Sequence, residues 1–370
     1  MRLSGDEACA LYAETDLHTL GALAHAARMR RHPERIVTYV ADRNINYSNI
    51  CTCACRFCAF FRPPGHPDGY VLTKEELARK ISETIELGGT QILLQGGLNP
   101  ALTLPRLEDM LSWIRTGFPS IHIHAFSPPE IAFFAEQAGL SDAEVIARLV
   151  KAGLHSIPGG GAEILAERVR SEVSPAKCSA ARWLAVMKEA HRQGLKTTAT
   201  MMFGHEESPA ERLEHLFALR ALQDETGGFT AFIPWTFQPS GTLLGEGKRE
   251  AVPSADSSGP LRAKSERVFH RSEPAQSYLR LLALSRLVLD NFPSLQVSWV
   301  TMGPQIAQLA LFFGANDFGS LMIEENVVAA AGVSFRLSRE EIRAIIGRAG
   351  FTPRQRTMDY SLVEQGVSTL

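Results

Sequence analysis

Four of the chain's six cysteines lie between positions 51 and 58. Cys51, Cys55 and Cys58 stand in C-x3-C-x2-C spacing, so one short loop can present three thiolates to one inorganic cluster. Thiolates are the usual protein ligands of iron–sulfur clusters. Three ligands leave one iron of a four-iron cluster open to a chelating cosubstrate. The spacing predicts a 4Fe–4S cluster held by Cys51, Cys55 and Cys58, with Cys53 as a bystander.

Two other sites compete for the same cysteines. A structural zinc ion normally takes four ligands, and no second Cys/His pair stands nearby at zinc spacing. A redox-active C-x2-C pair formed by Cys55 and Cys58 would leave Cys51 unexplained. A non-catalytic metal-binding module therefore remains as an alternative of another functional class.

Short β-rich runs alternate with longer helical patterns, which is typical of parallel βαβ units. We expect strands at 36–41, 90–95, 121–126, 154–157, 196–202, 229–235 and 295–300, with an eighth near 315–318. Helical patterns between them include 74–87, 142–152, 180–193, 210–224 and 276–290. These units predict an α/β fold, a (β/α) TIM-type barrel, with a doubly wound open sheet as the runner-up.

The ends of this barrel are predicted from composition and periodicity. Residues 1–35 form an N-terminal helical cap, and residues 36–370 form the barrel with C-terminal helices completing it. Residues 240–275 read as a flexible insertion, rich in Gly, Ser and Pro, whose middle (252–265) we expect to be disordered.

The overall charge excludes some partners. With 38 Lys+Arg against 40 Asp+Glu, the net charge is −2, which gives nucleic-acid binding little electrostatic support. No apolar run is long enough to cross a membrane, and residues 1–31 lack the hydrophobic run expected of a signal peptide. We expect a soluble, cytoplasmic protein.

Longer motifs resemble one known group of proteins. They are Asp42-Arg-Asn-Ile-Asn-Tyr-Ser-Asn, His122-Ile-His-Ala-Phe-Ser-Pro-Pro-Glu, Ile157-Pro-Gly-Gly-Gly-Ala-Glu, Thr200-Met-Met-Phe-Gly-His, Phe232-Ile-Pro-Trp-Thr-Phe-Gln-Pro, Trp299-Val-Thr-Met-Gly-Pro and Gly314-Ala-Asn-Asp-Phe-Gly-Ser. The resemblance is to the radical S-adenosylmethionine (SAM) superfamily, in its futalosine-pathway group, and most closely to cyclic dehypoxanthinyl futalosine synthases. Aminofutalosine synthases and deazaflavin (FO) synthase components are the alternatives within the group.

The resemblance implies a set of SAM-binding residues. Phe57 matches the aromatic position beside adenine, and Gln95, Gly96 and Gly97 match the Gly-rich element that receives the methionine amino group. The turn containing Glu207 matches one that flanks the adenine, and Met202 on the preceding strand belongs with it.

Glu163 follows three glycines that let the backbone approach a ligand closely. It is therefore a candidate for binding a ribose hydroxyl of SAM or of the substrate. Its structural alternative is a first-turn helix glutamate.

Three polar residues are candidates for catalysis by their placement. His124 shares one face of its strand with His122 and lies nearest the strand end, as a base or a packed imidazole. His205 lies in a loop after a strand, where functional residues concentrate. Asp317, in a Gly-flanked loop, either contacts the substrate sugar or fixes the turn.

The reaction that the resemblance implies is an oxidoreductase step of menaquinone biosynthesis. A 5′-deoxyadenosyl radical takes hydrogen from C4′ of dehypoxanthinyl futalosine, and C4′ then bonds to the aromatic ring. Loss of one electron and one proton restores aromaticity. The electron donor implied is a flavodoxin or ferredoxin.

Overall fold

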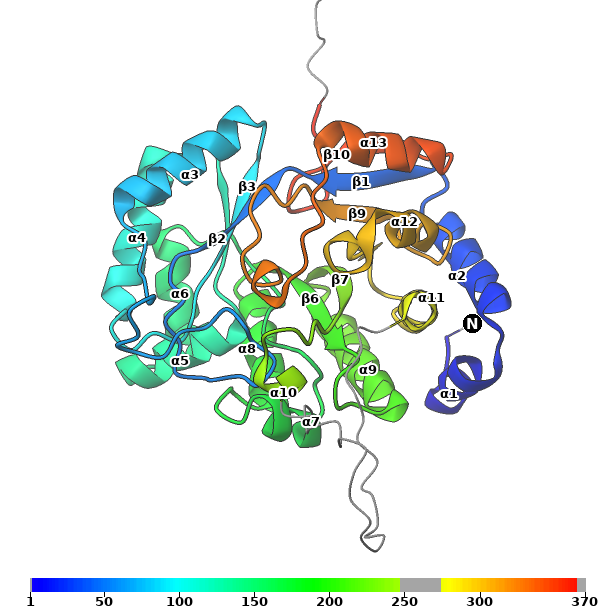
Figure 1. Ribbon diagram of the computed structural model, residues 1–370, viewed down its shortest axis with the longest axis horizontal. Helices are drawn as coiled ribbons and strands as arrows, with labels where there is room; N and C mark the ends of the chain where they lie inside the picture. The colour runs from blue at the N-terminus through cyan, green and yellow to red at the C-terminus, as the bar shows by residue number, and fades with distance from the viewer. Residues whose placement is uncertain (1, 247–273, 365–370) are drawn as a thin grey trace, which may run out of the picture.

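A computed structural model describes residues 2–246 and 274–364 of the chain. Within these ranges, seven parallel strands form one curled sheet whose strands follow the order of the chain (Figure 1). They are β2 (Asp42–Asn46), β3 (Gln91–Gln95), β4 (His122–Ala125), β5 (Ser156–Ile157), β6 (Lys196–Phe203), β7 (Phe229–Thr236) and β8 (Ser294–Leu295).

Alternation along each strand separates an inner from an outer face. On β2, Asp42 and Asn44 line a cavity inside the sheet's curve, whereas Arg43 between them points outward and pairs with Glu83. The register aligns Asp42 with Gln91. The inner face of β2 is therefore polar, and the outer face of the sheet packs on helices.

A second, three-stranded sheet closes the ring. It has the order β10-β1-β9, with β1 (Ile36–Val40), β9 (Asp317–Ser320) and β10 (Thr352–Gln355) all parallel. Ala41 alone separates β1 from β2. On the other edge, the Val297 N–H after β8 donates to the Asp317 carbonyl at 3.0 Å. The edges β8 and β2 are thus joined through β9 and β1 into a barrel.

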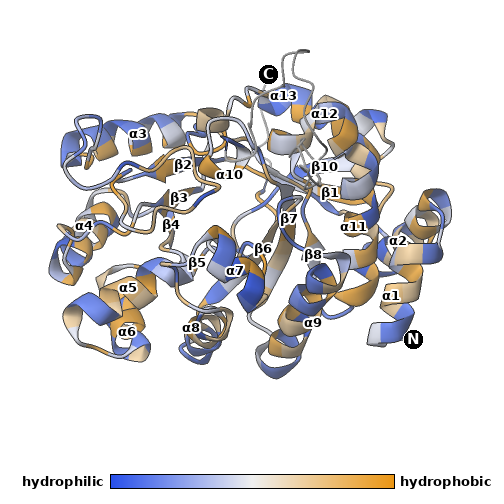
Figure 2. Ribbon diagram, turned by 60° about the horizontal axis from the view of Figure 1, so that its bottom comes forward, coloured by the Kyte–Doolittle hydropathy of each residue, from blue (hydrophilic) through white to orange (hydrophobic). Residues whose placement is uncertain are grey.

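Helices surround the strands, and single helices carry both hydrophilic and hydrophobic residues (Figure 2). On α6 the buried residues Val145, Ile146, Leu149 and Ala152 follow helical spacing. The helices are α1 (Gly5–Glu14), α2 (Leu17–Arg31), α3 (Lys74–Glu86), α4 (Leu104–Gly117), α5 (Pro128–Ala138), α6 (Asp142–Ala152), α7 (Glu167–Val173), α8 (Ala180–Arg192), α9 (Pro209–Thr226), α10 (Leu243–Glu246), α11 (Ala275–Val288), α12 (Trp299–Ala310) and α13 (Arg339–Arg348), with a 3-10 turn at Ala329–Ala331.

The barrel prediction is confirmed, and residues 1–35 contain the two helices α1 and α2, of which α2 packs on α11 (Figure 1). Three strand predictions are wrong in detail. The predicted strand 36–41 corresponds to β1, and a second strand, β2, follows it directly and runs to Asn46. The two are separate strands because they pair with different neighbours. The strand at 154–157 is only Ser156–Ile157, and that at 295–300 gives way to α12 at Trp299.

Two further predictions concern the insertion and the absence of a membrane-spanning segment. The proposed disorder at 252–265 lies outside the described residues. Among the described residues, no helix has the length and apolar composition needed to cross a bilayer.

Candidate active site

A cavity of about 270 Å³ lies inside the barrel, and residues of β2, β3, β4, β6 and β7 line it together with the loop after β5. The residues after β8, the start of α12 and the segment after β10 complete its wall. Its polar lining includes Asp42, Asn44, Gln91, Gln95, His124 and Gln296, and its apolar lining includes Trp235 and Trp299. This composition suits a ligand with both aromatic and hydroxyl groups.

The cysteine loop follows β2, at the carboxyl-terminal end of the barrel strands. The Cys51 N–H donates to the Arg62 carbonyl at 2.9 Å, and the Thr52 N–H donates to the Leu98 carbonyl at 3.1 Å. Ala54 has a φ of 45°, a left-handed conformation that turns the chain between the first two ligands. All three predicted ligands are free cysteines.

Cys53 differs from its neighbours in what its sulfur contacts. Its thiol donates to the Ala176 carbonyl at 3.4 Å. Hydrogen bonding to Cys51 and Cys55 raises the pKa of Cys53. The same contact lowers the pKa of Cys51 to about 6, and it also lowers the pKa of Cys55. Burial raises the pKa of Cys58 as well, so the thiol contact with Ala176, and not the pKa, distinguishes Cys53.

The donor set fits an iron–sulfur cluster. Two backbone N–H groups, of Cys53 and Leu98, point at Cys51 Sγ from 3.4 and 3.3 Å, as suits a thiolate ligand. Among residues 2–246 and 274–364, no three His, Cys, Asp or Glu side chains are grouped to hold a single metal ion. A cluster does not require such a group, because each cysteine binds a different iron.

The Gly-rich end of β3 packs directly against the cysteine loop. A Cβ on Gly97 would lie 2.2 Å from the Ile50 carbonyl oxygen and 2.7 Å from Cys51 Cβ. A Cβ on Gly96 would lie 2.4 Å from the Tyr47 ring. Glycine at these positions therefore lets the ligand loop approach the strand end.

Glu130 holds this strand end through hydrogen bonds to Tyr47 and Gly96. Its Oε1 accepts from the Tyr47 hydroxyl at 2.7 Å and from the Gly96 N–H at 3.0 Å. Sequence reasoning missed this role. The Ser127-to-Glu130 spacing signals a helix N-terminus, and that capping box exists on α5, but the further reach to Gly96 comes from the tertiary fold.

Glu163 and Lys177 form a buried ion pair beside the cysteines. Lys177 Nζ lies 2.5 Å from Glu163 Oε1 and 4.8 Å from the Phe57 ring centroid. Burial opposes the ionisation of Glu163, but Lys177 overcomes it and lowers the pKa of Glu163. The negative charges of Cys55 and Glu163 likewise raise the pKa of Lys177 against its burial. Glu163 adopts a left-handed φ of 41°, backbone strain of the kind found at functional sites.

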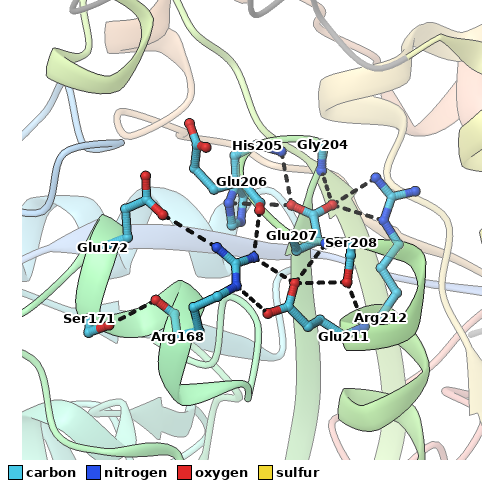
Figure 3. A network of polar contacts seen from close by, with 10 residues as sticks. All are labelled: Arg168, Ser171, Glu172, Gly204, His205, Glu206, Glu207, Ser208, Glu211 and Arg212. Carbon is cyan, nitrogen blue, oxygen red and sulfur yellow. Dashed lines mark hydrogen bonds and ion pairs between the residues drawn. The ribbon is translucent and has the colours of Figure 1, made fainter. Parts of the chain in front are cut away.

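The turn after β6 is a closed network of polar contacts (Figure 3). Glu207 accepts from the Gly204 N–H at 2.6 Å and the His205 N–H at 3.0 Å, and it pairs with Arg212 at 2.7 Å. His205 Nε2 lies 3.0 Å from the Met202 carbonyl. Burial lowers the pKa of His205, although Glu207 opposes the shift.

His124 lines the cavity, and one of its ring nitrogens forms a hydrogen bond within the sheet. Its Nδ1 lies 2.7 Å from Ser156 Oγ. Burial, aided by the charges of His122 and Arg356, lowers the pKa of His124 to about 3, so the ring is neutral.

Two acceptors on the neighbouring wall have no hydrogen-bond partner among the described residues, Asn44 Oδ1 and Gln91 Oε1. Asp42 fixes the amide of Gln91 by accepting from Nε2 at 2.7 Å. A ligand with hydroxyl or N–H donors would satisfy both acceptors.

Asp317 lies in a buried ion pair. Its Oδ2 accepts from Arg356 Nε at 2.5 Å and from the Thr38 hydroxyl at 2.5 Å, and its Oδ1 accepts from Arg356 Nη2 at 3.0 Å. Arg356 lines the cavity, whereas Asp317 does not.

The structure thus gathers only part of the predicted set around the cavity: Gln95, His124 and Glu163. Phe57, Gly96, Gly97 and the three cysteines adjoin one another at the ligand loop. His205, Met202, Glu207 and Asp317 lie outside the cavity lining, and their contacts are those of residues that hold a turn or a strand. Their direct roles stay predictions.

Two family descriptions match the chain. The radical SAM superfamily matches residues 45–219, which include the cysteine loop and Glu163. The CofH/MqnC C-terminal region matches residues 226–368, which include β9 and β10.

Several relatives match over nearly the full length. Cyclic dehypoxanthine futalosine synthase from Halalkalibacterium halodurans is 46% identical over 98% of this chain and 92% of its own. The protein of the same name from Streptomyces coelicolor is 42% identical, over 97% and 85%. The 5-amino-6-(D-ribitylamino)uracil–L-tyrosine 4-hydroxyphenyl transferase of Methanopyrus kandleri is 38% identical, over 96% and 92%.

Solved structures share the fold. Methylornithine synthase (PylB) superposes with a TM-score of 0.65 at 18% identity, covering 95% of this chain and 94% of its own. The FeFe-hydrogenase maturase HydG of Carboxydothermus hydrogenoformans gives 0.68 at 18%, covering 97% and 77%. With the full-length identities above, the chain belongs to the radical SAM superfamily, in the family of the cyclic dehypoxanthine futalosine synthases.

Proposed function

We propose that this enzyme converts dehypoxanthinyl futalosine to its cyclic form, a step of menaquinone biosynthesis. The observation that carries the proposal is the 46% identity to a protein of that name, which runs through the cysteine loop and the cavity-forming C-terminal region alike. The polar and aromatic lining of the cavity agrees with a substrate that has a sugar and a benzoate ring.

Cys51, Cys55 and Cys58 would hold the cluster. With SAM bound, such a cluster would supply 5′-deoxyadenosyl radical chemistry for taking the C4′ hydrogen and would accept the electron released when the ring regains aromaticity. For SAM we propose contacts with Phe57, Gln95, Gly96, Gly97, Glu163, Met202 and Glu207, the last two through the backbone turn they form. Lys177 sets the charge of Glu163 and stands beside the cysteines as a cation.

Inside the barrel, the unpartnered oxygens of Asn44 and Gln91 would accept from the sugar hydroxyls. His124 is neutral and faces the cavity, so its Nε2 is placed to take the proton that the ring gives up. His205 and Asp317 would support the reaction by positioning, His205 in the turn after β6 and Asp317 through Arg356.

The electron donor and the compartment follow from the chemistry. We propose a flavodoxin- or ferredoxin-type donor that docks near the cysteine loop, because a cluster of this kind must be reduced to act. The six free cysteines suit a reducing cytoplasm.

The test is an anaerobic assay of the reconstituted enzyme with reductant, SAM and one candidate substrate at a time. We expect 5′-deoxyadenosine together with a cyclised product of unchanged substrate carbon count from dehypoxanthinyl futalosine. Turnover only with the enolpyruvyl substrate of aminofutalosine synthases would overturn the assignment. So would turnover only with 5-amino-6-(D-ribitylamino)uracil and tyrosine.

A further inference from the structure

We propose that His124, Ser156 and His122 form a proton relay, which carries the proton released in the barrel to solvent at the amino-terminal ends of β4 and β5. The inference rests on the proposed function, because the cyclisation gives up one proton per turnover. It gives Ser156 and His122 a role in proton transfer, and neither residue needs to touch the substrate.

The three side chains form an unbroken chain of hydrogen bonds. His124 Nδ1 lies 2.7 Å from Ser156 Oγ, and the same oxygen lies 2.6 Å from His122 Nε2. The geometry comes from the sheet. His124 and Ser156 are direct partners in the β4–β5 register, and His122 precedes His124 by two residues on the same face of its strand.

The chain connects the cavity with the surface. His124 lines the cavity and is buried, as is Ser156. His122 is half-buried and does not line the cavity, and its ring lies 5.0 Å from that of the exposed His155. The cysteine loop lies at the opposite ends of the strands. The relay therefore leaves the barrel away from the mouth at which SAM would bind.

The groups around the two imidazoles keep both in the neutral form that a relay requires. Burial lowers the pKa of His122 to about 4, with His155 adding to the shift and Asp359 opposing it. Burial lowers the pKa of His124 to about 3, and the positive charge of Arg356, which lines the same cavity, disfavours its protonated form further. Each ring can then accept a proton and pass one on without holding it.

The proton steps balance atom by atom. Forming the C4′–ring bond leaves a ring C–H that must break. Its proton goes to His124 Nε2, and its electron goes to the oxidised iron–sulfur cluster. His124 Nδ1–H passes to Ser156 Oγ, and the serine proton passes to His122 Nε2. His122 then releases its Nδ1–H to water. A hydroxyl suits the middle position because it donates and accepts at once.

A simpler role for Ser156 is to fix the tautomer of His124, and the experiment separates the two. In His122→Gln the amide oxygen can still accept from Ser156, but an amide cannot relay a proton. The relay predicts that Ser156→Ala and His122→Gln each lower kcat at least about tenfold with little change in KM. It also predicts that both raise the ratio of 5′-deoxyadenosine to cyclised product, and that Ser156→Thr, which keeps the hydroxyl, restores both values.

His191 provides a matched control. Its ring nitrogens lie 2.7 Å from the hydroxyls of Thr226 and Thr197, and burial lowers its pKa to about 4. It does not line the cavity. His191→Gln should keep the wild-type kcat and product ratio, and iron content and thermal melting should show that all variants are folded and loaded.

Each result decides between the proposals. A defect in Ser156→Ala with normal kcat in His122→Gln would reduce Ser156 to tautomer control and overturn the relay. Wild-type behaviour of both variants, in an enzyme that makes the cyclised product, would overturn the relay alone. Failure of the wild-type enzyme to make any cyclised product would overturn the proposed function and the relay with it.

Discussion

Cys53 illustrates how much a single contact decides at the scale of one residue. It lies between Cys51 and Cys55 in sequence, but its thiol donates to the Ala176 carbonyl, and its hydrogen bonds raise its pKa. A ligand must be a thiolate. Because the Cys53 thiol donates to a backbone carbonyl, we expect it to lie beside the predicted ligands as a hydrogen-bond donor and not to bind iron.

Replacing Cys53 should accordingly spare the cluster. In Cys53→Ser the hydroxyl keeps the donor to Ala176, so we expect about the wild-type iron and sulfide content after anaerobic reconstitution. In Cys51→Ser the content should fall severely, and 5′-deoxyadenosine formation should cease. Iron and sulfide analysis with absorption spectroscopy measures the cluster content of both variants, and an assay for 5′-deoxyadenosine measures SAM cleavage. Loss of the cluster in Cys53→Ser would show that the ligand set is different.

The placement of residues was predictable from the sequence where it depends on local spacing. The grouping of the three cysteines in one loop and the position of the glycines after β3 are of this kind, and their binding roles stay predictions. Lys177 and Ser156 were not predictable, because their partners Glu163 and His124 lie on other elements. His205 is a loop residue, as its position suggested, but its side chain turns back to the Met202 carbonyl. Only the folded chain shows that direction.

At the scale of elements, the end of β3 and the cysteine loop act as one unit. Gly97 brings their backbones together, and the Leu98 N–H donates to Cys51 Sγ at 3.3 Å. The ligand loop thus takes its shape from a strand end as well as from its own sequence.

Gly97→Ala should disturb this unit. The new Cβ would lie 2.2 Å from the Ile50 carbonyl oxygen, a backbone atom that cannot yield without moving the loop. We expect a lower iron content and a lower melting temperature. The free energy of unfolding should fall by about 1–3 kcal/mol. Gly117→Ala is the control, since its Cβ would meet nothing within 4 Å at the end of α4. Equal iron content in both variants would refute the steric argument.

Elements with strong periodicity were predictable and elements set by pairing were not. The helix α6 matches its predicted bounds, because its buried residues follow one helical face. The division of the first strand at Ala41 has no local signal, since it reflects the different partners of β1 and β2. For the same reason β10 went unpredicted, as it exists only beside β1.

At the scale of the whole molecule, buried neutral histidines make stability depend on pH. Burial lowers the pKa of His215, like that of His124, to about 3. The unfolded chain binds these protons below about pH 6.5, while the folded protein does not. Folding is therefore favoured most above pH 6.5 and loses stability as the pH falls toward 3.

The effect of one histidine can be isolated with His215→Gln. His215 accepts the Leu165 N–H at 3.0 Å, a bond that the glutamine oxygen can replace, and it lies outside the cavity lining. Between pH 6.5 and 5, the wild-type stability should fall more steeply than that of the variant, by about 1.4 kcal/mol per pH unit. Anaerobic denaturant unfolding across this range measures the slopes. Parallel slopes would mean that His215 titrates normally in the folded state.

The closure of the barrel through β9 and β1 has a consequence for how the protein is made. The contacts that shape the ligand loop come from residues up to Leu244, whose N–H donates to the Arg56 carbonyl at 2.7 Å. The ring itself, however, closes only when Thr38 of β1 pairs with Asp317 of β9. On the ribosome, β1 must wait for almost the entire remaining chain before it finds its partners. The cavity inside the barrel therefore cannot be sealed until β9 has been synthesised.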